Sequence, residues 1–253
     1  MRRVPEGPPP PPVVQRIRLR YAKRGRLRFS SHRDFARAFE RALRRGEVPM
    51  GYSAGFSPHP KISYVGAAPT GVASEAEYVE IGLAQRRDVE EIRAMIDAAL
   101  PDGLDIVEAV ESSGGSLAER MEASQWEITL AGVDEDAARA AVEALMATTE
   151  LIVERVTKTG KKNVDVRGAL LAAEVRSAPN EPTGLERAIL GLVVRQETPA
   201  VRPDDVLAAL RVVAGLALSG PQLAVRLAQG PIDDSGTIGD PFAIDRAERQ
   251  ISS

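Results

Sequence analysis

The chain has 253 residues, no cysteine and a formal net charge of −3, with 43% hydrophobic and 27% charged residues. This length and composition predict a globular protein of one large or two smaller domains, and the lack of cysteine excludes disulfides, thiolate catalysis and cysteine-ligated metal centres. No apolar run reaches the roughly 18 residues that a membrane-spanning helix needs, so we expect a cytoplasmic protein with no membrane segment.

Positive charge is concentrated near the N-terminus. Residues 16–45 contain twelve Lys and Arg residues against two acidic residues, so this segment carries +10 (12 − 2) and the remainder −13 (−3 − 10). Such a local field governs the choice of partner more than the net charge does. We therefore expect a cationic surface in the N-terminal half.

The first elements follow from composition and alternation. Residues 1–15 include five consecutive prolines and predict a disordered, proline-rich arm. Residues 16–21 alternate arginine with apolar side chains, which predicts a strand with one buried and one cationic face. The alternation resumes over 26–29, after a turn at Gly25, and predicts a further extended segment.

A helix is predicted next. Ser31 and Asp34 resemble a capping box, and the helix should run to about Arg45 and end at Gly46. Its apolar face is led by Phe35, and its opposite face carries Arg33, Arg37, Arg41 and Arg44.

The rest of the first half completes a domain. Residues 77–83 and 104–110 predict strands on either side of an amphipathic helix at 88–100. The order of elements over 16–111 is that of a ferredoxin-like β-α-β-β-α-β domain, with the Gly- and Pro-rich stretch 51–66 between its middle strands.

The same order recurs in the second half. After a linker over 112–123, the patterns predict strands at 126–130, 151–156, 163–166, 185–194 and 222–227, and helices at 134–146 and 203–214. We therefore expect an α+β protein of two tandem ferredoxin-like (βαββαβ) domains, 16–111 and 124–230, followed by a flexible acidic tail over 231–253.

The two histidines are candidates for acid–base chemistry. His32 begins the predicted helix, where the helix dipole lowers the pKa of an imidazole, so it could act as the general base of metal-independent RNA cleavage. A contact with the local backbone or water is the favoured alternative. His59 lies between Pro58 and Pro60, which stiffen the backbone; it either contacts a phosphate or base, or is purely structural. Both histidines are catalytic only if the protein is a nuclease.

No metal or cofactor site is expected in this chain. Two histidines without His-x-x-x-His spacing or a nearby carboxylate pair do not form a ligand set. The sequence has no phosphate-binding loop, no dinucleotide fingerprint and no serine-nucleophile elbow. We therefore expect no activity of the chain on its own.

The arginines predict a surface for nucleic acid, because exposed arginines at strand and helix spacing can meet successive phosphates. A second basic spot lies at Lys158, Lys161 and Lys162. The expected nucleic-acid-binding residues are Arg18, Arg20, Arg28, Arg33, Arg37, Arg41, His59, Lys61, Lys161 and Lys162, and the expected site-shaping residues are Phe56, Pro58, Pro60 and Tyr64. Docking of an acidic protein on the same face is the alternative.

Four segments resemble the signature of a bacterial radical-SAM-linked family: RLRFSSHRD at 26–34, FERALRR at 39–45, GFSPHPKIS at 55–63 and GVASEAEY at 71–78. The resemblance is dense over 16–110 and thinner to about residue 230. This family is a domain of unknown function, fused to or encoded beside a radical SAM protein with a B12-binding-type domain. Its first half is similar to Cas6-type RNA endonucleases, which often carry a histidine near the first helix, as His32 loosely does here.

The resemblance implies a radical SAM partner that supplies the cluster, because a chain without cysteine cannot ligate it. We therefore expect the stand-alone form: a non-catalytic RNA-binding or substrate-presenting accessory protein in tRNA or rRNA modification or processing. A metal-independent RNA endonuclease with a histidine general base and a protein-interaction scaffold are the alternatives. We also expect His59 and Lys61 to face the arginine surface.

Overall fold

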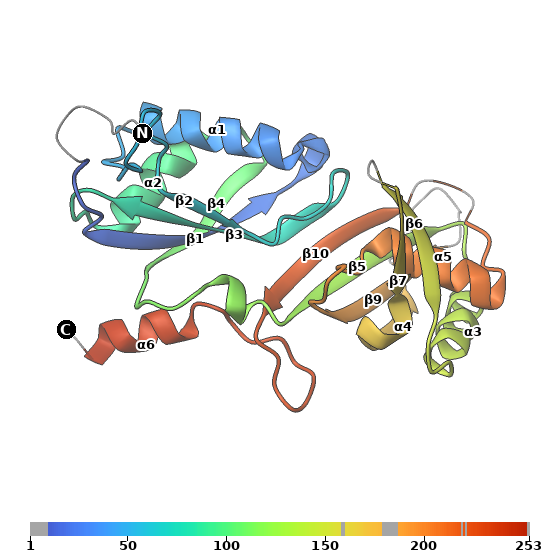
Figure 1. Ribbon diagram of the computed structural model, residues 1–253. Helices are drawn as coiled ribbons and strands as arrows, with labels where there is room; N and C mark the ends of the chain where they lie inside the picture. The colour runs from blue at the N-terminus through green and yellow to red at the C-terminus, as the bar shows by residue number, and fades with distance from the viewer. Residues whose placement is uncertain (1–9, 158–159, 179–186, 219, 221, 252–253) are drawn as a thin grey trace, which may run out of the picture. The chain divides into compact units, whose positions relative to one another are not determined.

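The computed structural model describes residues 10–157, 160–178, 187–218, 220 and 222–251 (Figure 1). The chain divides into two units. Unit 1 comprises the residues up to Glu119 together with the C-terminal segment from Pro241, and unit 2 comprises Arg120–Asp240. Both units combine antiparallel strands with α-helices, so the predicted α+β class is confirmed. None of the described helices is both long enough and apolar enough to cross a membrane.

Unit 1 has four paired strands. Its elements are β1 (Gln15–Lys23), the 3-10 helix η1 (Gly25–Phe29), α1 (His32–Arg45), β2 (Ile62–Val65), β3 (Ala73–Leu83), α2 (Val89–Ala99), β4 (Leu104–Glu111) and α6 (Ala243–Ile251). β1 pairs antiparallel with β3 and β4, and β2 pairs antiparallel with β3. The strand order within unit 1 is therefore β4-β1-β3-β2.

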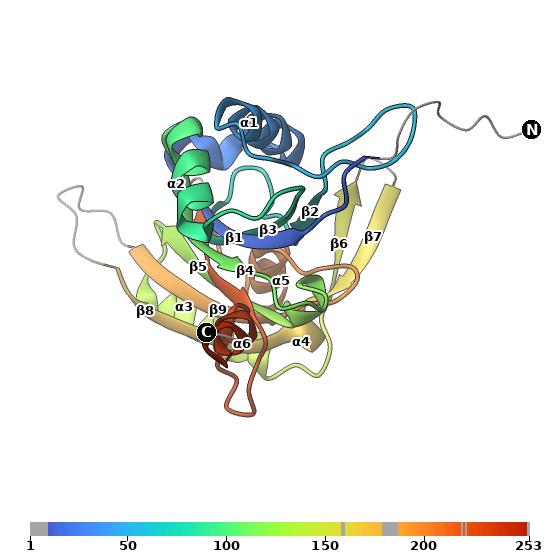
Figure 2. The same ribbon diagram turned by 90° about the vertical axis from the view of Figure 1, so that its left-hand side faces the viewer.

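The core of unit 1 lies between these strands and the helices α1 and α2, which cover one face of them (Figure 2). The alternation of β1 places Ile17, Leu19 and Tyr21 on this face, and all three are buried. Tyr21 stacks on Phe35 of α1 with ring centroids 4.0 Å apart. The apolar half of the β1 pattern thus fixes which side of the strand the helices cover.

The predicted start and end of α1 are confirmed. The Ser31 hydroxyl accepts a hydrogen bond from the Asp34 N–H at 3.2 Å, and the Asp34 carboxylate accepts one from the Ser31 N–H at 3.1 Å. Together they form the reciprocal capping box. Gly46 ends the helix.

Two local predictions in unit 1 are wrong. Residues 26–29 belong to η1 and not to a strand, because Gly25, at φ 53°, turns the chain and no strand pairs with this segment within the described residues. The stretch 51–66 does not join two strands: β2 lies inside it, so that residues 51–61 connect α1 to β2. An alternating pattern of only four residues, as at 26–29, is too short to distinguish a strand from another local structure.

Unit 2 contains a second set of paired strands. Its elements are η2 (Ala118–Arg120, at the boundary), β5 (Ala123–Ala131), α3 (Glu135–Met146), β6 (Ile152–Thr157), β7 (Gly160–Asp165), α4 (Val166–Ala169), β8 (Leu170–Ser177), β9 (Arg187–Arg195), α5 (Pro203–Ala214) and β10 (Leu223–Gly230). β5 pairs with β9 and β10, and β8 pairs with β9, giving the order β10-β5-β9-β8. β6 and β7 pair with each other in a separate two-stranded sheet.

The sequence patterns missed β8. The segment LLAAEVRS of β8 is rich in residues that favour helices, so its strand character comes from pairing with β9 and not from propensity. The pattern at 151–156 corresponds to β6, which belongs to the hairpin and not to the larger set of strands in unit 2.

Parts of the predicted arm and tail that the structure describes are held by contacts to the rest of unit 1. Residues 1–9 lie outside the described residues, but the N–H of Val14 bonds to the Leu83 carbonyl at 2.8 Å and Gln15 begins β1. At the other end, the segment expected to be a flexible tail contains α6. Phe242 is fully buried against Tyr78, with ring centroids 5.3 Å apart. Burial of the apolar Phe242 ring, which follows an Asp- and Gly-rich stretch, accounts for the folded structure of this segment.

Candidate functional site

The exposed side of α1 carries a row of arginines. Arg33, Arg37 and Arg41 are exposed, and within the part of the chain that the structure describes they form no hydrogen bond or ion pair. Arg44 lies 3.8 Å from the carboxylate of Glu40, which is a long ion pair. Because residues four apart share one side of a helix, these side chains form a continuous cationic row.

Segment 51–61 folds into a narrow hairpin. The Lys61 N–H bonds to the Gly51 carbonyl at 2.8 Å, and the Ser53 N–H bonds to the His59 carbonyl at 2.9 Å. The His59 N–H in turn donates to the Ser53 hydroxyl at 3.0 Å. The loop that carries His59 is thus held by its own stem, and we call residues 51–61 the 51–61 hairpin.

The base of the 51–61 hairpin is fixed to β3. The Gly51 N–H bonds to the Gly82 carbonyl at 2.7 Å, and the Gly82 N–H bonds to the Lys61 carbonyl at 2.9 Å. A Cβ on Gly51 would lie 2.7 Å from Cγ2 of Val13, so a larger residue here would force the Val13 side chain or the backbone to move. The position of the hairpin is therefore set by the strands of unit 1.

The 51–61 hairpin presents aromatic and basic side chains to solvent. The side chain of Phe56 is 66% exposed and that of Tyr52 is 42% exposed. Pro58, His59 and Lys61 are exposed as well. Exposed rings beside cationic side chains are typical of proteins that stack single-stranded bases.

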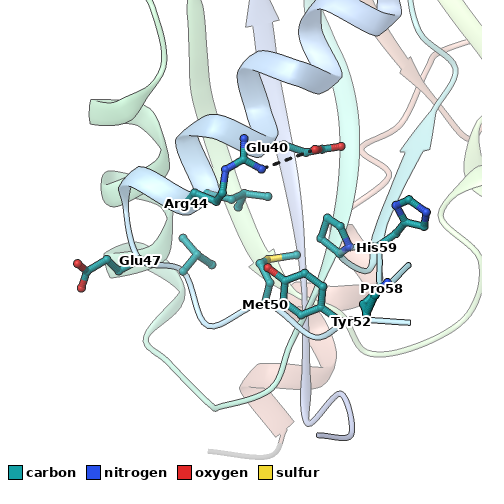
Figure 3. A pocket seen from close by; sticks show the side chains of 10 residues that line it. Glu40, Arg44, Glu47, Met50, Tyr52, Pro58 and His59 are labelled. Carbon is teal, nitrogen blue, oxygen red and sulfur yellow. Dashed lines mark ion pairs between the residues drawn. The ribbon is translucent and has the colours of Figure 1, made fainter. Parts of the chain in front are cut away.

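A pocket of about 400 Å³ lies between α1 and the 51–61 hairpin (Figure 3). We call it the α1–hairpin pocket. Figure 3 shows Glu40 and Arg44 on the α1 side and Tyr52, Pro58 and His59 on the other. Its lining residues are Glu40, Leu43, Arg44, Glu47, Val48, Met50, Tyr52, Pro58, His59 and Pro60. The structure thus brings His59 to the same pocket as Arg44.

His32 and Tyr64 lie beside each other on the flank of α1. Their rings meet edge to face with centroids 4.9 Å apart, and Tyr64 also meets Phe35 at 6.0 Å and Phe39 at 6.4 Å. The Tyr64 hydroxyl is buried and has no hydrogen-bond partner in the described part of the chain. Burial, together with the charge of Glu40, raises the pKa of Tyr64 well above its ordinary value.

We expect Tyr64→Phe to raise the free energy of unfolding by about 1 kcal/mol, because it removes a buried hydroxyl without a partner. The measurement is urea unfolding followed by circular dichroism. Tyr52→Phe removes an exposed hydroxyl and should change stability by less than about 0.5 kcal/mol. A destabilised Tyr64→Phe variant would contradict the absence of a partner.

The raised pKa of Tyr64 also fixes the sign of a pH effect. An unfolded tyrosine ionises near pH 10, while the folded Tyr64 hydroxyl stays protonated. The contribution of this protonated hydroxyl to the free energy of unfolding is therefore fully present below pH 10 and is lost as the pH rises above that value. Between about pH 10 and 11, the wild type should lose stability relative to Tyr64→Phe.

Other predicted residues lie in different surroundings. Arg28, on η1, packs over the exposed ring of Phe29, with its guanidinium carbon 4.7 Å from the ring centroid. In unit 2, Lys161 and Lys162 are exposed on β7, and Lys161 pairs with Glu154 at 2.8 Å. Lys158 lies outside the described residues.

The arginines of β1 do not share a surface with those of α1. Ile17 and Leu19 face the helices, so Arg16, Arg18 and Arg20 lie on the opposite face of the strands. Arg20 pairs with Glu108 at 3.2 Å, and Arg16 pairs with Glu80 at 3.0 Å. The prediction that strand and helix arginines form one surface together is therefore wrong.

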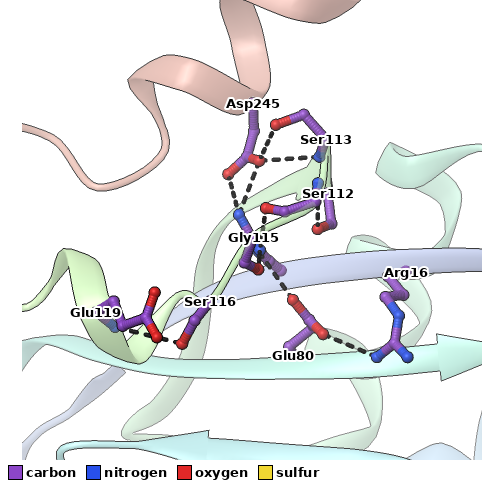
Figure 4. Close-up of polar contacts among 10 residues, drawn as sticks. Arg16, Glu80, Ser112, Ser113, Gly115, Ser116, Glu119 and Asp245 are labelled. Carbon is purple, nitrogen blue, oxygen red and sulfur yellow. Dashed lines mark hydrogen bonds and ion pairs between the residues drawn. The ribbon is translucent and has the colours of Figure 1, made fainter.

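Arg18 is fully buried and its guanidinium is saturated with partners. Nη1 bonds to both carboxylate oxygens of Asp245 at 2.8 and 2.9 Å, and Nε bonds to Glu80 at 2.9 Å. Nη2 donates to the carbonyls of Gly114 and Gly115 at 2.8 and 2.6 Å. The Ser113 N–H and hydroxyl also donate to Asp245 (Figure 4). Held in this way, Arg18 cannot bind a phosphate, which corrects its predicted role.

A metal site is not evident in the part of the chain that the structure describes, where no group of three or more His, Asp or Glu side chains converges. His32 and His59 are both exposed. Among the described residues, neither imidazole donates a hydrogen bond to a carboxylate.

A bacterial family described as "Uncharacterized protein conserved in bacteria (DUF2344)" matches residues 16–203. No curated protein matches the chain significantly. Among solved structures, the chain is similar to a protein of Galdieria sulphuraria described as "Crystal Structure of an Unknown Protein". The two share 17% identity over 79% of this chain and 91% of that chain, with a TM-score of 0.23.

Proposed function

Because the chain belongs to the DUF2344 family of bacterial proteins, whose description assigns no activity, we propose its function from the chemistry of its own surface. The proposed function is binding of single-stranded RNA by α1 and the 51–61 hairpin of unit 1. In this proposal the protein is non-catalytic and presents tRNA or rRNA to a radical SAM partner that modifies or processes it.

One observation carries the RNA part of this proposal. Arg33, Arg37 and Arg41 lie in a row on α1 without ion-pair partners among the described residues, and the neighbouring hairpin exposes Tyr52 and Phe56. Cations supply the salt-dependent affinity for phosphates, and exposed rings stack on unpaired bases.

The radical SAM partner is proposed from the resemblance of segments 26–34, 39–45, 55–63 and 71–78 to the radical-SAM-linked family. The chain has no cysteine, so the iron–sulfur cluster of such a reaction would be held by the partner. This chain would contribute the RNA and its orientation.

We further propose that both units are ferredoxin-like. The orders β4-β1-β3-β2 and β10-β5-β9-β8 support this, because each places the first and third strands at the centre and the second and fourth at the edges. In unit 2 the β6–β7 hairpin would then be an insertion.

Binding to a fluorescein-labelled single-stranded RNA tests the proposed function. We expect the affinity measured by fluorescence anisotropy to fall steeply between about 50 and 200 mM KCl. The triple variant Arg33→Gln/Arg37→Gln/Arg41→Gln should bind more weakly at every salt concentration. Its salt slope should be smaller by about 2, because each phosphate contact on a single strand contributes about 0.7.

The control for this experiment is Arg87→Gln/Arg195→Gln/Arg211→Gln, which removes the same charge from exposed arginines elsewhere. It should bind RNA like the wild type. Equal loss in both variants would mean that only net charge matters, and binding that is absent or insensitive to salt would overturn the proposal.

A further inference from the structure

We infer that the α1–hairpin pocket binds one unstacked base of the RNA, and that Glu40 makes guanine the preferred base. This inference rests on the proposed function. It adds a defined base-binding site to the cationic row of α1 and names the base that fits it.

The size and walls of the pocket suit a single base. Its volume of about 400 Å³ is near the lower end of the range for small-ligand sites, about 300–1,000 Å³. The apolar part of the wall is formed by Met50, Tyr52, Pro58 and Pro60. Tyr52 is partly exposed, so its ring is available to stack on a planar ligand.

The walls of the pocket are also positioned before any ligand binds. The two hydrogen bonds between Ser53 and His59 close the stem of the 51–61 hairpin. Pro58 and Pro60 restrict the backbone on both sides of His59. A rigid wall loses little conformational entropy on binding, which favours affinity for a small flat group.

The charges in the pocket favour a base over a phosphate. Glu40 and Arg44 line it from α1, whereas the carboxylate of Glu47, another lining residue, points away from the other labelled side chains (Figure 3). A phosphate would be repelled by the Glu40 carboxylate, whereas a neutral base can donate N–H bonds to it. The phosphates of the same strand would lie outside, along the unpaired arginines of α1.

Glu40 selects among the bases. Its separation of 3.8 Å from Arg44 is too long for a hydrogen bond, and its carboxylate accepts no hydrogen bond in the described part of the chain. An ionised carboxylate offers two acceptors side by side. The Watson–Crick edge of guanine presents two adjacent donors, whereas adenine, cytosine and uracil each place an acceptor beside their donor. Guanine alone therefore matches both oxygens.

Short oligouridines with one central G, A or C test this inference by fluorescence anisotropy. The wild type should bind the G oligomer at least about fivefold more tightly than the A oligomer, the lower end of what a bidentate pair provides. Glu40→Gln should bring the G/A ratio close to one, because an amide offers one donor and one acceptor. Glu91→Gln makes the same charge change at an exposed position on α2 and should keep the preference.

Tyr52→Ala tests the stacking wall separately. It should weaken binding of all three oligomers by about fivefold or more, the lower end of what one stacked base contributes, and should leave the G/A ratio unchanged. Circular dichroism spectra that match the wild type confirm that each variant is folded.

A direct readout comes from the two histidines of the chain. His32→Asn assigns the imidazole proton signals, and guanosine monophosphate should then shift the His59 signal more than adenosine monophosphate does. RNA binding without a G preference, or a preference that Glu40→Gln retains, would overturn this inference and leave the proposed function intact. No RNA binding by the wild type would overturn the proposed function itself. Mononucleotide binding as tight as that of the oligomer would mean that the ligand is a free nucleotide and not RNA.

Discussion

Asp245→Ala should lower the free energy of unfolding of unit 1 by about 3 kcal/mol, the lower end of the cost of breaking a buried pair, because it removes the carboxylate that binds Nη1 of the buried Arg18 while Nε keeps Glu80. Arg18 is fully buried and Asp245 is 2% exposed, and two hydrogen bonds of 2.8 and 2.9 Å join them.

The measurement is urea unfolding followed by two probes. The only tryptophan, Trp126, lies in unit 2 on β5, so its fluorescence should report a transition that the substitution leaves nearly unchanged. Far-ultraviolet circular dichroism should show an additional transition of unit 1 at lower urea concentration. A single unshifted transition in both probes would contradict the prediction.

Two variants separate the buried pair from the simple loss of a carboxylate. Asp102→Ala removes an exposed carboxylate of unit 1 and should change stability by less than about 0.5 kcal/mol. The double variant Arg18→Met/Asp245→Leu removes both charges together. It should recover most of the stability that Asp245→Ala loses, since apolar replacements of a buried pair are often neutral or stabilising.

Phe39→Ala should lower the free energy of unfolding by about 3–5 kcal/mol, because it opens a cavity in the core between α1 and the strands of unit 1. Phe39 is fully buried. Its ring centroid lies 5.5 Å from that of Phe35 and 6.4 Å from that of Tyr64. Phe35 also stacks on Tyr21 and Tyr64 also meets His32, so we expect the surroundings to fill the space only in part.

Phe56→Ala is the matched control for Phe39→Ala, because the same atoms are removed from a side chain that is 66% exposed. We expect it to change stability by less than about 0.5 kcal/mol. Urea unfolding followed by circular dichroism measures both variants. Equal effects of the two substitutions would show that the α1 core of unit 1 is not packed as described.

The sequence predicted those helices and strands whose pattern or capping residues lie within a few residues of each other. The alternation of residues 16–21 identifies β1 and its buried face, and the Ser31–Asp34 spacing identifies the start of α1. Both depend on the period of a strand or on a hydrogen bond three residues away. The cationic side of α1 follows from the same reasoning, since arginines four residues apart must share a side of the helix.

Long-range pairing could not be predicted in this way. The alternation of β1 shows that its arginines share one face, but it does not show what covers that face. One partner of Arg18, Asp245, lies 227 residues away in a segment whose composition is typical of a flexible tail. The α1–hairpin pocket likewise depends on Gly51 and Gly82, which lie on separate segments and meet only after β3 has formed.

The discontinuity of unit 1 has a consequence for synthesis on the ribosome. Asp245 is translated 227 residues after Arg18, an interval of roughly 10 to 45 s at about 5–20 residues per second. All of unit 2 is translated in that interval, since it comprises Arg120–Asp240. Docking of α6 is therefore a late event in the maturation of the chain, and until then the nascent protein carries an arginine that its fold is built to enclose.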